Sequence, residues 1–94
     1  MEKKVCAHVI ITGKVQGVFF RMETMRTAER SNIKGWVKNR TDGSVEAMFE
    51  GEKENVEFVL CWCSEEGPPL SDVTNVAINW EGYSGKFNEF KIIY

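Results

Sequence analysis

Hydrophobic residues alternate with polar ones along several short stretches of the chain, and in two longer stretches they recur every three or four positions. Alternation is typical of a half-buried strand, and the longer spacing is typical of a helix with one apolar face. The alternating stretches predict strands at residues 5–12, 34–40, 45–50, 72–80 and 87–94. The helical spacing predicts helices at residues 21–31 and 52–66, the second of which is stopped by Gly67-Pro68-Pro69.

The order of these elements predicts the architecture. A β-α-β-β-α-β order with a short terminal strand is that of the ferredoxin-like α+β sandwich, in which two helices cover one face of an antiparallel sheet. A chain of 94 residues is the right size for one such domain. We therefore expect residues 1–94 to form a single domain.

Several positions give more specific expectations. The first strand is apolar on both faces, which suits a central strand. The third strand alternates so that Glu50 lies on its wet face, and Gly51 ends it. Asn32 fits the left-handed position at the end of the first helix, and we expect Phe20 and Trp36 to lie in the core. The apolar stripe of the second helix comprises Val56, Val59, Leu60 and Cys63.

The segment between the first strand and the first helix runs Gly13-Lys14-Val15-Gln16-Gly17-Val18-Phe19-Phe20-Arg21. A short loop that ends at a helix N-terminus points several backbone N–H groups at one place, where the helix dipole adds positive potential. A cation there is unfavourable by roughly 0.3–1 kcal/mol, so Arg21 at the helix start indicates a bound anion that compensates it. The guanidinium also matches phosphate with a planar fork of donors. The segment therefore predicts a phosphate site.

The same loop lacks the residues of other phosphate sites. Tyrosine-phosphatase-type loops have a cysteine six positions before the arginine, whereas Val15 stands at that position here. No Gly-Lys-Ser/Thr follows the glycines, as nucleotide-binding loops require. His8 is the one histidine of the chain, and no paired histidines or Cys-x-x-Cys spacing indicates a metal site. We expect a phosphate that is held without a covalent bond and without a metal.

Charge and cysteine content limit the classes of function. A net charge of −2 argues against a nucleic-acid binder, which normally has a basic face, and against a polybasic membrane patch. No apolar run approaches the roughly 20 residues of a membrane span. The N-terminal residues lack a signal-peptide pattern, and three cysteines do not indicate a disulfide framework. We expect a monomeric cytoplasmic protein with reduced cysteines.

Three motifs resemble those of the acylphosphatase family. They are Gly13-x-Val15-Gln16-Gly17-Val18-x-Phe20-Arg21, then Gly35-Trp36-Val37-x-Asn39-x-x-Asp42-Gly43-x-Val45-Glu46, and then Gly67-Pro68-Pro69-x-x-x-Val73. The likeness continues to Phe90-x-Ile92-x-Tyr94. It implies a ferredoxin-like enzyme that hydrolyses acyl phosphates to a carboxylate and inorganic phosphate without a metal or cofactor. It places the phosphate-binding arginine at Arg21, the water-positioning asparagine at Asn39, and the phosphate cradle at Val15, Gln16, Gly17, Val18, Phe19 and Phe20.

The residue types suit that reaction. The leaving group is a carboxylate with a pKa near 4, so it departs without a proton. Phosphoryl transfer needs positioning and charge stabilisation, which backbone N–H groups and Arg21 supply. Asn39 offers an acceptor and two donors that can hold a water in line with the leaving group. Because an amide is no base, we expect the phosphate itself to take the proton.

Two other interpretations remain open. A ferredoxin-like domain can hold an anion as a non-catalytic regulatory module, which would bind phosphate without turnover. RNA-recognition modules share the fold, but their exposed aromatic pattern and basic face are missing from this sequence. Gln16 either contacts the substrate or braces the loop by hydrogen bonds. Many relatives carry a basic residue where this chain has Ile93, which leaves the support of the last strand open. The sequence does not name the physiological acyl phosphate.

Overall fold

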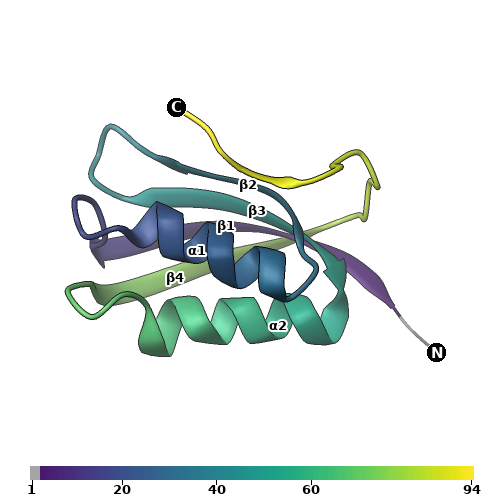
Figure 1. The fold of residues 1–94 in the computed structure, drawn as a ribbon, viewed down its shortest axis with the longest axis horizontal. Coiled ribbons are helices and arrows are strands. Elements are labelled where there is room, and N and C mark those ends of the chain that lie inside the picture. The colour runs from purple at the N-terminus through teal and green to yellow at the C-terminus, as the bar shows by residue number, and fades with distance from the viewer. Residues whose placement is uncertain (1–2) are drawn as a thin grey trace.

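Two helices cover one face of a five-stranded sheet (Figure 1) in the computed structural model, which describes residues 3–94. The elements in chain order are β1 (Lys4–Lys14), α1 (Phe20–Arg30), β2 (Lys34–Asn39), β3 (Val45–Glu52), α2 (Lys53–Cys61), the π-helical turn η1 (Trp62–Glu66), β4 (Asp72–Glu81) and β5 (Phe90–Ile92). The strands lie in the order β4-β1-β3-β2-β5. The predicted ferredoxin-like α+β fold is confirmed.

β1 is an interior strand, as its two apolar faces predicted. It pairs antiparallel with β3 on one side and with β4 on the other. The middle strand of the five is β3, because it also pairs antiparallel with β2. Four strands therefore form the antiparallel sheet that the element order predicted.

The sequence predicted the short terminal strand without its direction, and in the structure β5 pairs with β2 in parallel. The connection from β4 to β5 crosses from one edge of the sheet to the other, so β5 enters beside β2 in the same direction (Figure 1). The pairing is short and aligns Val37 with Ile92. Ile93 N also donates to Val37 O at 2.9 Å. The chain beyond Ile92 is thereby held along the end of β2.

The predicted end of the third strand at Gly51 was wrong. Gly51 pairs with Val5, and the ladder continues to Glu52 opposite Lys4. Glu52 therefore ends β3 and stands at the N-cap of α2, one position before the helix begins, whereas the spacing predicted it as the first helical residue. The end of α1 follows the prediction, since Asn32 has the left-handed φ of 55° just after the C-cap Ser31.

The core fills the space between the helices and the inner face of the sheet. Within it, the whole predicted stripe of the second helix is buried, comprising Val56, Val59, Leu60 and Cys63. Phe20 is only 1% exposed, and its ring lies 5.9 Å from that of Trp62. Burial of a phenylalanine side chain stabilises a fold by roughly 1.5–3 kcal/mol. The first residue of α1 is thus fixed to the core, which fixes the position of the residues around it.

The outer face of the sheet holds two residues whose environments the sequence did not predict. Glu50 is 2% exposed, because Ser84 N and Oγ donate to its Oε2 at 2.6 and 2.7 Å and the 82–89 connection folds over it. Trp36 lies half-buried on this face and not in the core, with its ring 6.3 Å from that of His8. Strand alternation is the cause, since Trp36 stands opposite Met48, which also points away from the helices.

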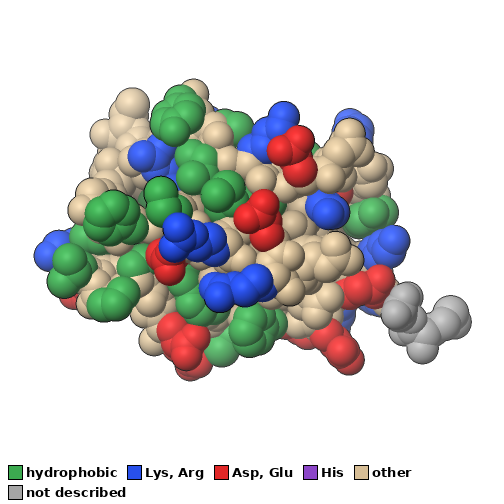
Figure 2. All heavy atoms as spheres, in the orientation of Figure 1, with side chains coloured by type: hydrophobic (Ala, Val, Ile, Leu, Met, Phe, Trp, Pro, Cys, Tyr) green, Lys and Arg blue, Asp and Glu red, His purple; other side chains and the backbone are tan. Residues whose placement is uncertain are grey.

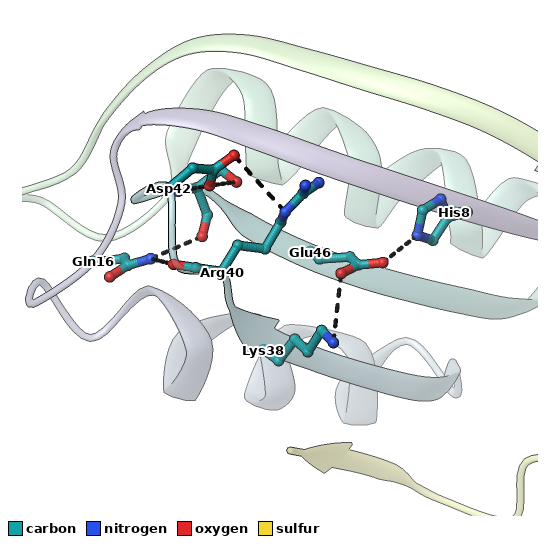
Figure 3. Close-up of polar contacts among 7 residues, drawn as sticks. His8, Gln16, Lys38, Arg40, Asp42 and Glu46 are labelled. Carbon is teal, nitrogen blue, oxygen red and sulfur yellow. Dashed lines mark hydrogen bonds and ion pairs between the residues drawn. The ribbon is translucent and has the colours of Figure 1, made fainter. Parts of the chain in front are cut away.

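A chain of polar side chains crosses the same face (Figure 3). His8 Nε2 donates to Glu46 Oε2 at 2.6 Å, and Lys38 Nζ lies 3.7 Å from Glu46 Oε1. The hydrogen bond from His8, and then the Lys38 charge, hold the pKa of Glu46 below its ordinary value. The carboxylate is therefore stabilised in its ionised form.

Within residues 3–94, none of the helices is long and apolar enough to cross a membrane.

Replacing Glu46 by glutamine tests this polar chain. A lowered pKa in the folded state contributes stability above the ordinary glutamate pKa of about 4.3, and that contribution is lost as the pH falls through the folded pKa. We expect Glu46→Gln to lower the free energy of unfolding by about 0.5–1 kcal/mol at pH 7 and by less at pH 3. Urea titrations measure both values, with the exposed Glu57→Gln as the control. An equal deficit at the two pH values would contradict the assignment.

Candidate active site

The loop between β1 and α1 is held at both ends by buried side chains. Val15 and Val18 are buried in the core, as is Phe20. Between and after the two valines the backbone is left-handed, with φ of 74° at Gly17 and 63° at Phe19. Alternation of right- and left-handed residues forms backbone concavities that bind anions. The apolar residues therefore hold the loop in place, and the left-handed residues shape it.

The N-terminus of α1 faces this loop without a side-chain cap. Phe19 is the N-cap residue, and its side chain makes no capping hydrogen bond. The first bond of the helix runs from Glu23 N to Phe19 O at 3.0 Å. The N–H groups that precede Glu23 N in the first turn therefore have no capping side chain as acceptor. They form the positive end of the helix dipole. Such a helix start favours an anion.

Arg21 is the second residue of α1 and is half-buried. Among residues 3–94, no carboxylate forms an ion pair with its guanidinium. Its neighbour is the ring of Tyr94, whose centroid lies 5.3 Å from the guanidinium carbon. The charge of Arg21 and the dipole of α1 thus add up at one place, as the sequence predicted for a phosphate site.

Asn39 is the last residue of β2. Its Oδ1 is buried, and in the part of the chain that the structure describes it accepts no hydrogen bond. A buried acceptor without a partner costs about 1–3 kcal/mol, and such a group in a folded chain calls for an explanation. A ligand or water in the neighbouring cleft would supply the missing donor.

Arg21 and Asn39 line the same cleft of about 320 Å³. The other residues of its lining are Val15, Gly17, Phe19, Phe20, Met22, Ile92 and Tyr94. Five members of the predicted phosphate cradle, counting Arg21, are therefore brought together with Asn39. Gln16 and Val18 are absent from the lining. The described lining holds no histidine, cysteine or acidic side chain that could act as a nucleophile or a base.

Gln16 points instead toward the turn between β2 and β3 (Figure 3). Its Nε2 donates to Arg40 O at 2.8 Å and to Ser44 O at 2.9 Å. These carbonyls follow Asn39 in the chain, so the two bonds tie the phosphate loop to the turn next to Asn39. In the structure the Gln16 side chain braces the loop, one of the two roles left open by the sequence.

The thiols are unsuited to nucleophilic chemistry. Burial raises the pKa of Cys6 and of Cys63 to about 12. A hydrogen bond to Glu65, with the charge of that carboxylate, raises the pKa of the exposed Cys61. All three are free cysteines. Residues 3–94 contain no group of three histidine, cysteine or acidic side chains that could hold a metal ion.

Sequence reasoning missed three residues of the cleft, namely Met22, Ile92 and Tyr94. Met22 directly follows Arg21, so its place at a helix start facing the loop was a usable signal. Ile92 and Tyr94 reach the cleft through the parallel pairing of β5 with β2. That pairing joins segments far apart in the chain, and no local pattern in the sequence predicts it.

Together these features define a ferredoxin-like domain with a cleft at the N-terminus of its first helix, lined by Arg21 and Asn39. The sequence also matches the family model described as acylphosphatase over residues 7–92. It is 50% identical over 88 residues to the acylphosphatase of Pelotomaculum thermopropionicum, which covers 94% of this chain and 95% of that relative. The chain therefore belongs to the acylphosphatase family, which is a family of enzymes.

Solved structures agree with this membership. The crystal structure of the Bacillus subtilis acylphosphatase has a TM-score of 0.91 and 32% identity, and the match covers 96% of this chain and 99% of that one. The acylphosphatase structure from Coxiella burnetii has a TM-score of 0.85 and 40% identity, covering 96% of this chain and 93% of that one.

Substituting Gln16 tests the brace between the loop and the turn. Each hydrogen bond contributes about 0.5–1.5 kcal/mol, so we expect Gln16→Ala to lower the free energy of unfolding by about 1–2 kcal/mol. It should also weaken the binding of inorganic phosphate, because the loop is no longer tied to the Asn39 side of the cleft. Urea denaturation and the rise in Tm with added phosphate measure the two effects. Asn79→Ala, an exposed amide on β4, is the matched control, and a Gln16 variant that behaves like it would exclude the brace.

Proposed function

We propose that this enzyme hydrolyses acyl phosphates to a carboxylate and inorganic phosphate. Loop 15–20 and Arg21 bind the phosphoryl group, and Asn39 positions the attacking water. The observation that carries the proposal is that, within residues 3–94, one cleft joins an arginine without an acidic partner to a buried amide oxygen without a donor. Both groups are poised for a ligand that is an anion on one side and a hydrogen-bond donor on the other.

Charge stabilisation falls to Arg21 and the loop. The transition state of phosphoryl transfer is loose, and its charge is spread over three oxygens. Backbone N–H groups at the start of α1 and the guanidinium are held in place before the reaction, so they need no reorganisation as that charge moves. The bond from phosphorus to the acyl oxygen breaks, and its electron pair leaves with the carboxylate, which requires no proton from the enzyme.

Asn39 positions the attacking water. Its Oδ1 accepts a hydrogen bond from the water, which orients the water oxygen toward phosphorus in line with the leaving carboxylate. The new bond joins this oxygen to phosphorus. An amide does not take up the released proton, so a phosphoryl oxygen does, and the products are the carboxylate and inorganic phosphate. The two side chains that this route uses, Arg21 and Asn39, both line the cleft.

We also propose that residues 1–94 act as one domain and that the enzyme works as a monomer in the cytoplasm. Support for the monomer comes from the cleft, in which residues of this chain bring Arg21 and Asn39 together. Support for the single domain comes from the sheet, which joins strands from both ends of the described chain.

Alanine variants of Arg21 and Asn39 test the mechanism. Loss of one preorganised donor costs about 10²–10³-fold in kcat, so we expect at least that loss for Arg21→Ala and for Asn39→Ala with benzoyl phosphate. Asn39→Ala should keep or raise Tm, because it removes a buried acceptor that lacks a partner. Hydrolysis is followed by ultraviolet absorbance with EDTA present, and circular dichroism checks the fold. Lys91→Ala, an exposed cation on β5, controls for a general loss of positive charge.

The results separate two functions. Turnover by the wild type that survives both alanine substitutions would reject the assigned roles. A folded wild type without turnover, whose Tm still rises with inorganic phosphate, would instead favour the non-catalytic anion-binding module. Equal loss in Lys91→Ala would show that charge alone, without a specific role for Arg21, accounts for the effect.

A further inference from the structure

Three exposed apolar side chains surround the cleft, and we call Phe19, Met22 and Tyr94 the apolar rim. Phe19 is 72% exposed, Met22 is 41% exposed and Tyr94 is 99% exposed. All three line the cleft that contains Arg21 and Asn39. In the space-filling view, hydrophobic side chains gather over the N-terminal end of α1, between the preceding loop and the C-terminal segment (Figure 2). An anion site is thus bordered by surface that water solvates poorly.

Phe19 occupies an unfavourable place for a phenylalanine. Its backbone is left-handed, with φ of 63° and ψ of 21°, a conformation that costs a residue with a side chain about 1–2 kcal/mol. Glycine would adopt it without that cost. The ring gains no core burial in return, whereas Val18 and Phe20 on either side are buried. Strain of this kind is characteristic of functional sites, and here it presents a ring at the mouth of the cleft.

Tyr94 also lines the cleft. Its ring lies over Arg21, 5.3 Å from the guanidinium carbon. The hydrogen bond from Ile93 N to Val37 O holds this segment beside β2. A phosphate bound by Arg21 would therefore have the tyrosine ring close to it.

Charges in the cleft narrow the class of substrate. Arg21 has the one charged side chain in the described lining of the cleft, and under the proposed function the phosphoryl group occupies it. A second anionic group would find no further cationic side chain there, a charged amine would find no acidic side chain, and either would lose hydration on entering. An apolar acyl group gains from the same surroundings, because it buries its own surface together with that of the rim.

We propose that the apolar rim binds the acyl group, and that the enzyme prefers acyl phosphates with an aromatic or other bulky apolar acyl group over acetyl phosphate and over substrates with a second charge. This inference rests on the proposed function. It assigns the side chains of Phe19, Met22 and Tyr94 to substrate selection, whereas the backbone of the loop, the Arg21 side chain and the Asn39 side chain bind phosphate and water.

The test compares kcat/KM for benzoyl phosphate and for acetyl phosphate. Phe19→Asn removes the ring but tolerates the left-handed backbone, and Tyr94→Ser removes the second ring. Discrimination by an apolar pocket is worth about 10–200-fold, so we expect the ratio of benzoyl to acetyl kcat/KM to fall about tenfold in the double variant. The difference in intrinsic reactivity between the two substrates cancels, because each variant is compared with the wild type.

Matched variants separate the rim from general effects. Phe19→Tyr and Tyr94→Phe keep the rings and should keep the benzoyl preference. Phe58→Asn removes another exposed phenylalanine from α2, away from the cleft, and should leave the ratio unchanged. An unchanged ratio of benzoyl to acetyl kcat/KM in the double variant, whether both values fall equally or neither falls, would overturn the assignment of the rim to the acyl group.

Failure of the proposed function is recognised separately. In that case the folded wild type hydrolyses neither substrate, and the rim is tested by calorimetric binding of benzylphosphonate and methylphosphonate. Tighter binding of benzylphosphonate that disappears in the double variant would uphold the rim as an apolar subsite. Equal affinity of the wild type for the two phosphonates would overturn it.

Discussion

The pairing of β3 with both β1 and β2 is the interaction on which the site depends. Val45 stands opposite Ile11 on one side and opposite Asn39 on the other. The end of β1, where the phosphate loop begins, is therefore held one strand away from the end of β2. The bonds from Gln16 to the β2–β3 turn then tie the two ends together. Without this register, the arginine and the asparagine would not share a cleft.

Much of the fold could be predicted from the sequence, because most of it depends on local patterns. Alternating residues located four strands to within a few positions, and helical spacing gave the buried face of the second helix. The parallel pairing of β5 lay beyond such patterns, since it depends on the path of a long connection. The burial of Glu50 was not predicted for the same reason, because its partner, Ser84, belongs to that connection. Gly51 stayed in its strand because the ladder with β1 continues past it.

The candidate site was predictable to the extent that its residues are close in sequence. The loop from Val15 to Arg21 and the turn after Asn39 carry recognisable motifs, and the structure places Arg21 and Asn39 in one cleft. The hydrogen-bond partners of Gln16 could be recognised only in the structure, because an amide in a loop has many available partners. The same holds for Tyr94, since only the pairing of β5 with β2 shows that the last residue of the sequence reaches the cleft.

Among the described residues Arg21 has no acidic partner, and this affects how such an enzyme behaves as its reaction proceeds. Under the proposed mechanism, inorganic phosphate presents to the loop the same oxygens as the substrate, so the groups that bind the reactant also retain one product. The acyl product has only the exposed rim to hold it and leaves readily. Release of phosphate then competes with the next turnover, and activity declines as phosphate accumulates around the enzyme. Because Arg21 has no acidic partner among residues 3–94, phosphate binds to it without displacing one. Catalysis thereby becomes responsive to the phosphate concentration around the enzyme.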